Sequence, residues 1–211
     1  MSIRKPPAKL ASPNVTVLRA GKRLHRVHDS SFAANDFNPC RGGATRFAPI
    51  HDAGGRCVPS LYTGSTLEAA IHETIFHDIP ARARIKTVPK RNVSSRAHGE
   101  LELTRDLQLA TLRTPDLKKW RIRRTDLIAS SPTLYGDTAE WAKAIHDQFS
   151  RIHGLVWTSN QCDPDDAHLF FGDRVSSADF TIVSARDGRT DPTFIADVRA
   201  TGSRDGITIT V

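Results

Sequence analysis

Short apolar runs bounded by turn-forming residues recur along the whole chain, and they constrain the fold more than any other feature. Runs of this length, rich in β-branched and aromatic residues, predict β-strands. We expect strands at 15–18, 23–28, 60–63, 155–158, 168–171, 180–184, 194–198 and 207–211, and another within 101–112. Because few segments have helical periodicity, the pattern predicts the α+β class: a compact mixed β-sheet core with flanking helices.

Two segments predict helices. Residues 65–78 start with Ser65 and Glu68, which have the spacing of a capping box, where each side chain satisfies the other residue's backbone N–H. Residues 137–153 start in the same way, with Asp137 three positions before a glutamate. In both segments the apolar residues recur every three or four positions, as on one face of a helix.

The length and composition fit one ordered domain. The chain has 211 residues, of which 38% are hydrophobic and 25% charged, as in globular rather than disordered proteins. Residues 1–14 contain three prolines and little to bury, so we expect a flexible N-terminal arm before a single domain at 15–211.

The apolar pattern and the cysteine spacing indicate in which cellular compartment the protein is expected. No run of about 18 apolar residues is present, so we expect no transmembrane helix, and the first residues lack the apolar segment of a secretory signal. Cys40, Cys57 and Cys162 lie far apart without a C-x-x-C pair. This spacing argues against a zinc site and a disulfide framework, and it favours a reducing compartment, the cytoplasm.

The charge is uneven along the chain. The formal net charge is +7, and residues 1–100 carry 16 Lys or Arg against 7 Asp or Glu, whereas residues 101–211 carry 14 against 16. A basic first half indicates an anionic partner, which could be a nucleic acid, a phosphorylated small molecule or an acidic protein. Composition does not choose among these three.

Two patterns superficially indicate metal or thiol chemistry. His72 and His77 flank a glutamate as in the zinc-protease motif H-E-x-x-H, but they are five residues apart and point about 140° away from each other on a helix. The stretch from Cys162 to Asp166 is typical of a solvated acidic turn. Cys57 has a histidine nearby but no third group that would activate it. We therefore expect no metal site and no cysteine nucleophile.

Glu73 lies off the apolar side of its predicted helix, which includes Ile71 and Ile75. Periodicity alone favours a solvated glutamate. The alternative is that this side of the helix lines a cleft, because it also carries His72 and Phe76, and Phe is unusual on a fully exposed surface.

Five short motifs, taken in order, resemble those of the RES domain, a family named for its Arg, Glu and Ser residues. The resemblance covers about residues 23–175, and its most specific parts are the stretch from Tyr62 to Glu73 and the G-x-x-W-x-S stretch. The motifs are LHRVH at 24–28, TRF at 45–47, LYT at 61–63, EAAIHETIFHD at 68–78 and GLVWTS at 154–159.

The resemblance implies a fold, an activity and a partner. RES proteins are typically toxins of bacterial toxin–antitoxin pairs with Xre-type antitoxins, and their fold resembles diphtheria-toxin-like ADP-ribosyltransferases. They degrade NAD at the nicotinamide–ribose bond by hydrolysis or phosphorolysis, and some ADP-ribosylate a protein. The implied substrate is NAD, with inorganic phosphate as the co-substrate of phosphorolysis, and no cofactor is implied. Nucleic acid would be contacted only through the antitoxin. Residues 15–211 would form one RES-type catalytic domain, with 176–211 a C-terminal elaboration.

The resemblance also implies a site, carried over position by position: Arg26, Arg46, Tyr62, Glu73 and Ser159. Many RES proteins have G-G-R-W-N at the second arginine. Here two residues separate the Gly-Gly pair from Arg46, and a second G-G-R ends at Arg56. Arg46 is preferred because Phe47 can replace the tryptophan, and Arg56 stays open as the alternative.

These residue types suit NAD cleavage. The bond breaks with oxocarbenium character on the ribose, which the Glu73 carboxylate would stabilise, and nicotinamide leaves as a neutral molecule without a general acid. Arg26 and Arg46 suit the pyrophosphate, because guanidinium groups bind phosphate oxygens in pairs. Tyr62 would stack on the nicotinamide ring. Ser159 would bind the carboxamide or fix Glu73.

Other classes of function stay open. A basic RNA-binding or RNA-cleaving module is one, although the chain has only two Tyr and three Trp and no recognisable nucleic-acid motif. A catalytically inactive interaction protein is another, and the intact site residues argue against it. A protein ADP-ribosyltransferase is the alternative on the same fold, because the sequence does not reveal whether water, phosphate or a protein accepts the ADP-ribosyl group.

Overall fold

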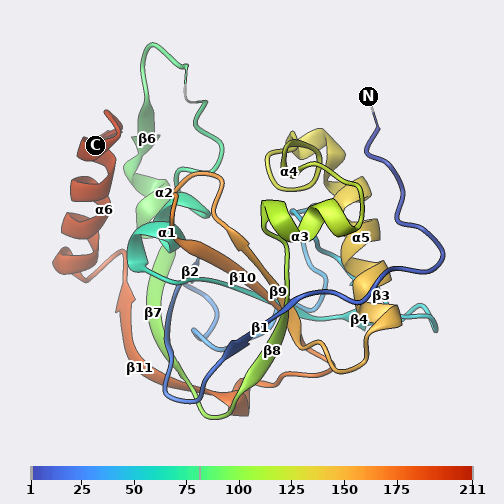
Figure 1. Cartoon of the computed structure of the whole chain (residues 1–211). Helices are drawn as coiled ribbons and strands as arrows, with labels where there is room; N and C mark the ends of the chain where they lie inside the picture. The colour runs from blue at the N-terminus through green and yellow to red at the C-terminus, as the bar shows by residue number, and fades with distance from the viewer. Residues whose placement is uncertain (1, 81, 211) are drawn as a thin grey trace.

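The computed structural model describes residues 2–80 and 82–210. Its main sheet contains β1 (Val15–Leu18), β2 (Arg23–Asp29), β5 (Ser60–Gly64), β7 (Arg96–Leu103), β8 (Leu107–Thr111), β9 (Gly154–Thr158), β10 (Asp166–Phe171) and β11 (Phe180–Asp187). The strand order is β1-β8-β9-β10-β5-β2-β7-β11, and all neighbours are antiparallel except β8 and β9. Figure 1 shows this sheet curling between two groups of helices, so the predicted α+β class is confirmed.

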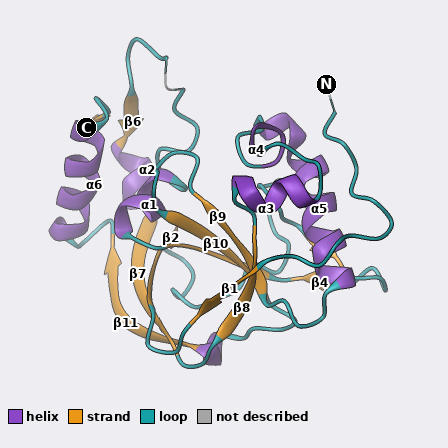
Figure 2. Cartoon of the chain, in the orientation of Figure 1, coloured by secondary structure: helices purple, strands orange, loops and turns teal. Residues whose placement is uncertain are grey.

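The helices lie on two sides of the sheet (Figure 2). One group is α1 (Leu67–His72), α2 (Lys90–Ser94) and α6 (Pro192–Arg204), and the other is α3 (Thr114–Lys119), α4 (Arg124–Leu127) and α5 (Tyr135–Gln148). Short 3-10 turns occur at Pro132–Leu134 and Ser177–Asp179. Four short strands form two small pairs, β3 (Ile50–His51) with β4 (Cys57–Val58), and β6 (Thr87–Pro89) with β12 (Thr208–Thr210). Within the described ranges, no helix is long and apolar enough to cross a membrane.

Most predicted strands are confirmed, and one is wrong. The run at 101–112 is divided between β7 and β8. The run at 194–198 lies inside α6, because the Asp191 side chain caps the backbone N–H groups of Thr193 and Phe194, and Pro192 occupies the first turn. Of the run at 207–211, residues 208–210 form β12, and residue 211 lies outside the described residues.

The predicted helix at 65–78 is shorter in the structure. Thr66, rather than Ser65, caps α1 by accepting the N–H of Ala69 at 3.1 Å. The helix ends at His72 because the carbonyl of Ile71 accepts three successive N–H groups, those of residues 74–76. The predicted capping box with Ser65 is therefore wrong, and residues 73–78 form successive turns instead of continuing the helix.

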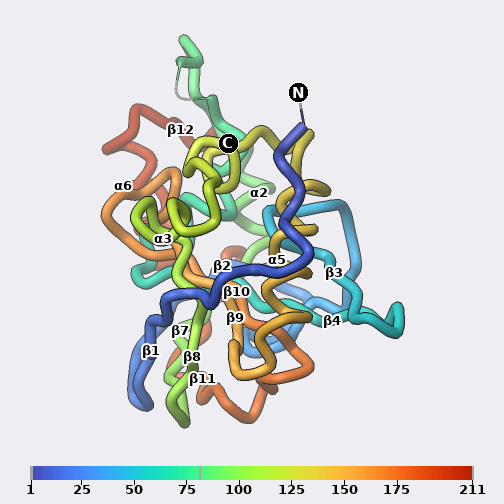
Figure 3. Tube along the Cα trace, turned by 45° about the vertical axis from the view of Figure 1, so that its right-hand side comes forward, coloured from blue at the N-terminus to red at the C-terminus, as the bar shows by residue number. Residues whose placement is uncertain are grey.

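The N-terminal segment, expected to be a flexible arm, packs along α5 (Figure 3). The N–H of Ile3 donates to the Asp137 carboxylate at 2.8 Å, so this aspartate does not form the predicted capping box. The indole N–H of Trp141 donates to the carbonyl of Arg4 at 2.7 Å. Ile3 and Leu10 are buried. Residues 2–14 therefore contact α5 through backbone groups and through these two buried side chains.

Cys40 and Cys57 form a disulfide, so the argument against a disulfide from the cysteine spacing is wrong. A backbone bridge between Asn38 and Ser60 brings the two segments together, which their separation in sequence does not reveal. Cys162 remains a buried free thiol. The argument for a reducing compartment from the cysteine spacing therefore no longer holds.

Candidate active site

A cavity of about 580 Å³ opens between β2 and β5. In the described part of the chain these strands pair only at His25 and Gly64, and beyond that pair they separate. A volume of this size is typical of small-molecule sites. Gly64 lets α1 approach closely, because a Cβ there would lie 2.7 Å from the backbone nitrogen of Ala70. The end of α1 therefore reaches the cavity wall.

Arg26 lines the cavity from β2. Its Nη1 atom donates to the carbonyls of Ala34 and Asp36 at 2.7 and 2.6 Å, so the arginine holds the loop after β2 against the sheet. Burial lowers the pKa of Arg26 to about 10, and the nearby Asp36 opposes that shift. The guanidinium is therefore charged at neutral pH.

Arg46 lines the cavity from the loop before β3. Its guanidinium lies over the ring of Tyr135, 5.1 Å from the ring centroid, and its Nη1 donates to the Ser130 hydroxyl at 3.0 Å. The next residue, Phe47, has a positive φ of 77° and is fully buried against Trp157. Such a backbone is strained for a non-glycine residue, and it directs Phe47 into the core while Arg46 faces the cavity.

Arg56 lies outside the cavity. It is at the turn between β3 and β4, its side chain is 85% exposed, and it pairs with the Asp52 carboxylate at 2.8 Å. Asp52 also accepts the N–H groups of Gly54 and Arg56, so the second G-G-R forms a hairpin turn. The geometry favours Arg46 over Arg56 as the second arginine of the site.

Tyr62 lines the cavity from β5. Its hydroxyl donates to the carbonyl of Arg46 and lies 3.0 Å from the Thr45 hydroxyl. Burial raises its pKa, so the phenol stays protonated at neutral pH. Its ring packs edge-on against Trp157. The hydroxyl thus anchors the arginine loop, which leaves the ring as the part of Tyr62 that can contact a ligand.

Glu73 and Ser159 are brought together from distant parts of the chain. Glu73 is the C-cap residue of α1 and lines the cavity, and Ser159 follows β9 and is fully buried. The Ser159 hydroxyl accepts the N–H groups of Gln161 and Cys162, at 3.2 and 3.0 Å, and it donates to Glu73 Oε1 at 2.5 Å. Because both acceptor positions are used, its proton points at Glu73. Ser159 therefore fixes the carboxylate and does not itself line the cavity.

Two residues expected to share the face of Glu73 lie elsewhere. Phe76 is buried near α6, where a Cβ at Gly202 would lie 3.3 Å from its ring, and His72 packs edge-on against Phe76. Thr74 and His77 line the cavity beside Glu73 instead. The early end of α1 explains the difference, because the turn after His72 no longer follows helical spacing.

Several cavity residues were not identified from the sequence. Tyr135 lies at the start of α5, and its hydroxyl is 2.9 Å from Nε2 of His77. Trp157 belongs to a quoted motif, but its buried indole N–H has no acceptor among the described residues. The chain has only two tyrosines, and both line the cavity.

The charges around the cavity are mixed with an excess of arginine. The charged residues that line it are Arg26, Arg41, Arg46, Arg96, Asp29, Asp36 and Glu73. Within the described ranges, neither Arg26 nor Arg46 forms an ion pair with a carboxylate. The cavity is therefore lined by four arginines against three carboxylates, and its one glutamate is held in a fixed orientation, an arrangement suited to an anionic small molecule.

Comparisons with known proteins agree with this site. The family model described as RES domain matches residues 23–191, a range that contains all five of the motif residues. The chain belongs to the RES domain family. Among solved structures, it is similar to a chain of "Crystal structure of the M.tuberculosis MbcT-MbcA toxin-antitoxin complex", with a TM-score of 0.61 and 13% identity over 87% of this chain and 92% of that chain. The comparison with curated proteins finds no match.

The RES assignment agrees with the predicted fold. The curled sheet with helices on both sides is consistent with the expected likeness to ADP-ribosyltransferases. The family match extends past residue 175 and includes β11, which pairs with β7 in the main sheet. Residues 192–211, with α6 and β12, lie beyond the matched range.

Proposed function

We propose that this RES protein cleaves the nicotinamide–ribose N-glycosidic bond of NAD. The observation that carries the proposal is Glu73 at the cavity wall, with one carboxylate oxygen held by Ser159 and the other available to a ligand. A carboxylate fixed in this way can stabilise positive charge that develops on a ribose without reorganising during the reaction.

The proposed reaction follows from the residues present. The glycosidic C–N bond breaks, its electron pair goes to the nicotinamide nitrogen, and the ribose becomes cationic. Glu73 stabilises that cation, and a nucleophile then forms the new bond at the same carbon and gives its proton to solvent. Arg46 binds a phosphate of NAD, helped by Arg26, and the ring of Tyr62 packs on the nicotinamide.

Three acceptors for the ADP-ribosyl group distinguish three reactions. Water gives ADP-ribose, inorganic phosphate gives ADP-ribose 1″-phosphate, and a protein side chain gives a modified protein. Incubating the purified protein with NAD, with and without phosphate and with a cell extract, separates these outcomes by chromatography and mass spectrometry. We expect nicotinamide with a small-molecule product. Modified protein without a matching small-molecule product would establish the ADP-ribosyltransferase alternative.

We further propose that the protein is the toxin of a toxin–antitoxin pair, with an Xre-type protein antitoxin and a cytoplasmic location. Membership of the RES family and the fold shared with a chain of the MbcT–MbcA complex support this proposal. An acidic antitoxin segment would complement residues 1–100, which carry 16 Lys or Arg against 7 Asp or Glu. Its association should slow as salt rises, because screening weakens charge steering beyond about 10 Å at 0.1 M. Association rates that do not change with salt would contradict electrostatic recognition.

A further inference from the structure

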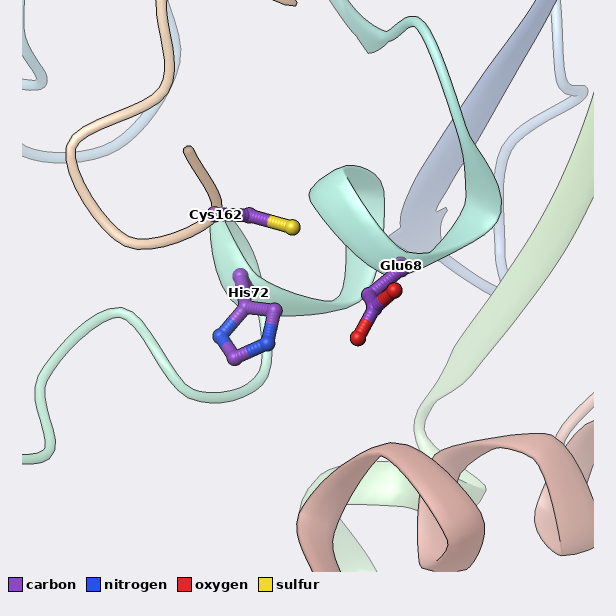
Figure 4. Close-up of side chains that lie close together, drawn as sticks. All are labelled: Glu68, His72 and Cys162. Carbon is purple, nitrogen blue, oxygen red and sulfur yellow. The ribbon is translucent and has the colours of Figure 1, made fainter. Parts of the chain in front are cut away.

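Three side chains with metal-binding atoms lie close together at α1, and none of them lines the cavity (Figure 4). Glu68 and His72 are four residues apart on α1, so they share one face of the helix. Cys162 approaches them from the turn after β9. One ligand atom from each residue lies within 4.8 Å of the others, and His72 and Cys162 are buried.

A fourth oxygen atom lies beside this cluster. Asp205 is the C-cap residue of α6, and its Oδ2 atom is 3.0 Å from Nε2 of His72. That oxygen is buried, and it makes no hydrogen bond of acceptable geometry among the described residues. Apart from the imidazole of His72, this oxygen has no partner in the described ranges, so a cation shared with His72 would satisfy it.

We propose that Glu68, His72 and Cys162 bind a divalent cation of the zinc type, with Asp205 as the fourth donor. Thiolate, imidazole and carboxylate are the ligands that zinc prefers, and four ligands complete its tetrahedral geometry. On binding, the thiol of Cys162 releases its proton to solvent as the sulfur–metal bond forms. This site is separate from the cavity and does not depend on the proposed activity.

Arg204 competes with the cation for Glu68. Its guanidinium pairs with the Glu68 carboxylate, and its side chain is largely exposed. The arginine can therefore leave without disturbing the core, and its charge would oppose a metal ion bound next to it. Removing this side chain should strengthen metal binding, whereas removing a ligand should weaken it.

The bound cation would join the two segments that hold the Glu73–Ser159 pair. His72 directly precedes Glu73, and the N–H of Cys162 donates to the Ser159 hydroxyl at 3.0 Å. A cation bound by both His72 and Cys162 would hold these two segments together outside the cavity. We therefore expect the cation to stabilise the folded protein.

Cadmium provides a direct probe, because a cadmium–thiolate bond absorbs in the ultraviolet. With the Cys40–Cys57 disulfide intact, Cys162 is the one free thiol of the chain, so any such band reports on it. Titration of the wild-type protein with Cd²⁺ should give the band with one equivalent, and Zn²⁺ should displace it. Cys162→Ser should abolish the band, and the remote surface variant Glu140→Gln should keep it.

Two further variants keep the proposal testable if Cys162→Ser does not fold. Glu68→Gln should weaken cadmium binding at least about tenfold, because even the loss of a group that only supports a metal ligand typically costs that much, and Arg204→Ala should strengthen it. Zn²⁺ should also raise the Tm of the wild-type protein but not that of folded Cys162→Ser. Absence of the band in the wild type, or unchanged affinity in both Glu68→Gln and Arg204→Ala, would overturn the proposal.

Discussion

Three motif residues use polar atoms to build the cavity wall. The Nη1 atom of Arg26 holds the loop after β2, the Tyr62 hydroxyl holds the backbone of Arg46, and the Ser159 hydroxyl holds Glu73. Glu73 keeps one oxygen available, and Arg46 keeps a charge without a carboxylate partner in the described ranges. At the scale of single residues, we therefore assign the substrate contacts mainly to Glu73 and Arg46.

Removing the Ser159 hydroxyl tests this division of roles. Ser159→Ala should lower kcat for NAD cleavage between about tenfold and a hundredfold, because the Glu73 carboxylate loses its fixed orientation. The KM should change little, because Ser159 does not line the cavity. Steady-state kinetics measure both quantities. A large rise in KM with normal kcat would show instead that Ser159 binds the substrate directly.

The two candidate arginines can be compared by the same substitution. Arg46→Ala should raise the KM for NAD about tenfold to a hundredfold, with a smaller effect on kcat, because a phosphate contact exists in both the ground state and the transition state. Arg56→Ala is the matched control and should leave both constants unchanged, since its side chain is 85% exposed at a hairpin turn. The opposite pattern would reverse the assignment.

The loop between β2 and β3 is the element that positions Arg46. It has little regular structure, and its conformation depends on the Cys40–Cys57 disulfide, the Asn38–Ser60 bridge and the Tyr62 hydroxyl. Loops tied in this way can keep a side chain in place without helix or strand hydrogen bonds. The disulfide is thus expected to support both the stability of the protein and the geometry of the site.

Breaking the disulfide should affect both properties. The double variant Cys40→Ser/Cys57→Ser should lower the free energy of unfolding by about 2–4 kcal/mol, because the unfolded chain loses a cross-link, and it should raise the KM for NAD. Denaturant unfolding and steady-state kinetics measure the two effects. A reductant should reproduce them in the wild type and have no effect in the variant. Equal stability of the oxidised and fully reduced wild type would contradict this role.

Helices and strands were predicted correctly where a short stretch of sequence determines them. The strands that carry Arg26 and Tyr62 appear as expected, since each is a short apolar run bounded by turns. The run at 194–198 was predicted wrongly because its β-branched residues outweighed the Asp191 cap. The end of α1 could not be predicted, because the three N–H groups that share the carbonyl of Ile71 form no sequence motif.

For the whole molecule, the association of distant segments limited what the sequence could reveal. The candidate site residues follow from the family motifs, whereas the disulfide, the contacts of residues 2–14 with α5 and the positions of Tyr135 and His77 depend on tertiary packing. Long-range packing also buries His98 and His168 in the sheet and lowers the pKa of each to about 3, mainly through burial.

These two histidines predict how stability depends on pH. Between about pH 6.5 and pH 3 the unfolded chain binds protons at His98 and His168 that the folded protein excludes, so stability falls as the pH falls. Each should contribute a loss of about 2 kcal/mol between pH 8 and pH 5. Urea unfolding should show a smaller loss in His168→Gln, and the exposed His51→Gln serves as the control. An identical pH dependence in all three proteins would contradict this account.

The central claim, that Glu73 makes this cavity an NAD-cleaving site, is tested most directly by the rate of nicotinamide release from NAD. The purified wild-type protein should release nicotinamide with turnover. Glu73→Gln keeps the size of the side chain and removes its charge, and it should lower the rate at least about a hundredfold with the fold intact. No nicotinamide from the wild type, or equal rates from a folded Glu73→Gln protein, would contradict the claim.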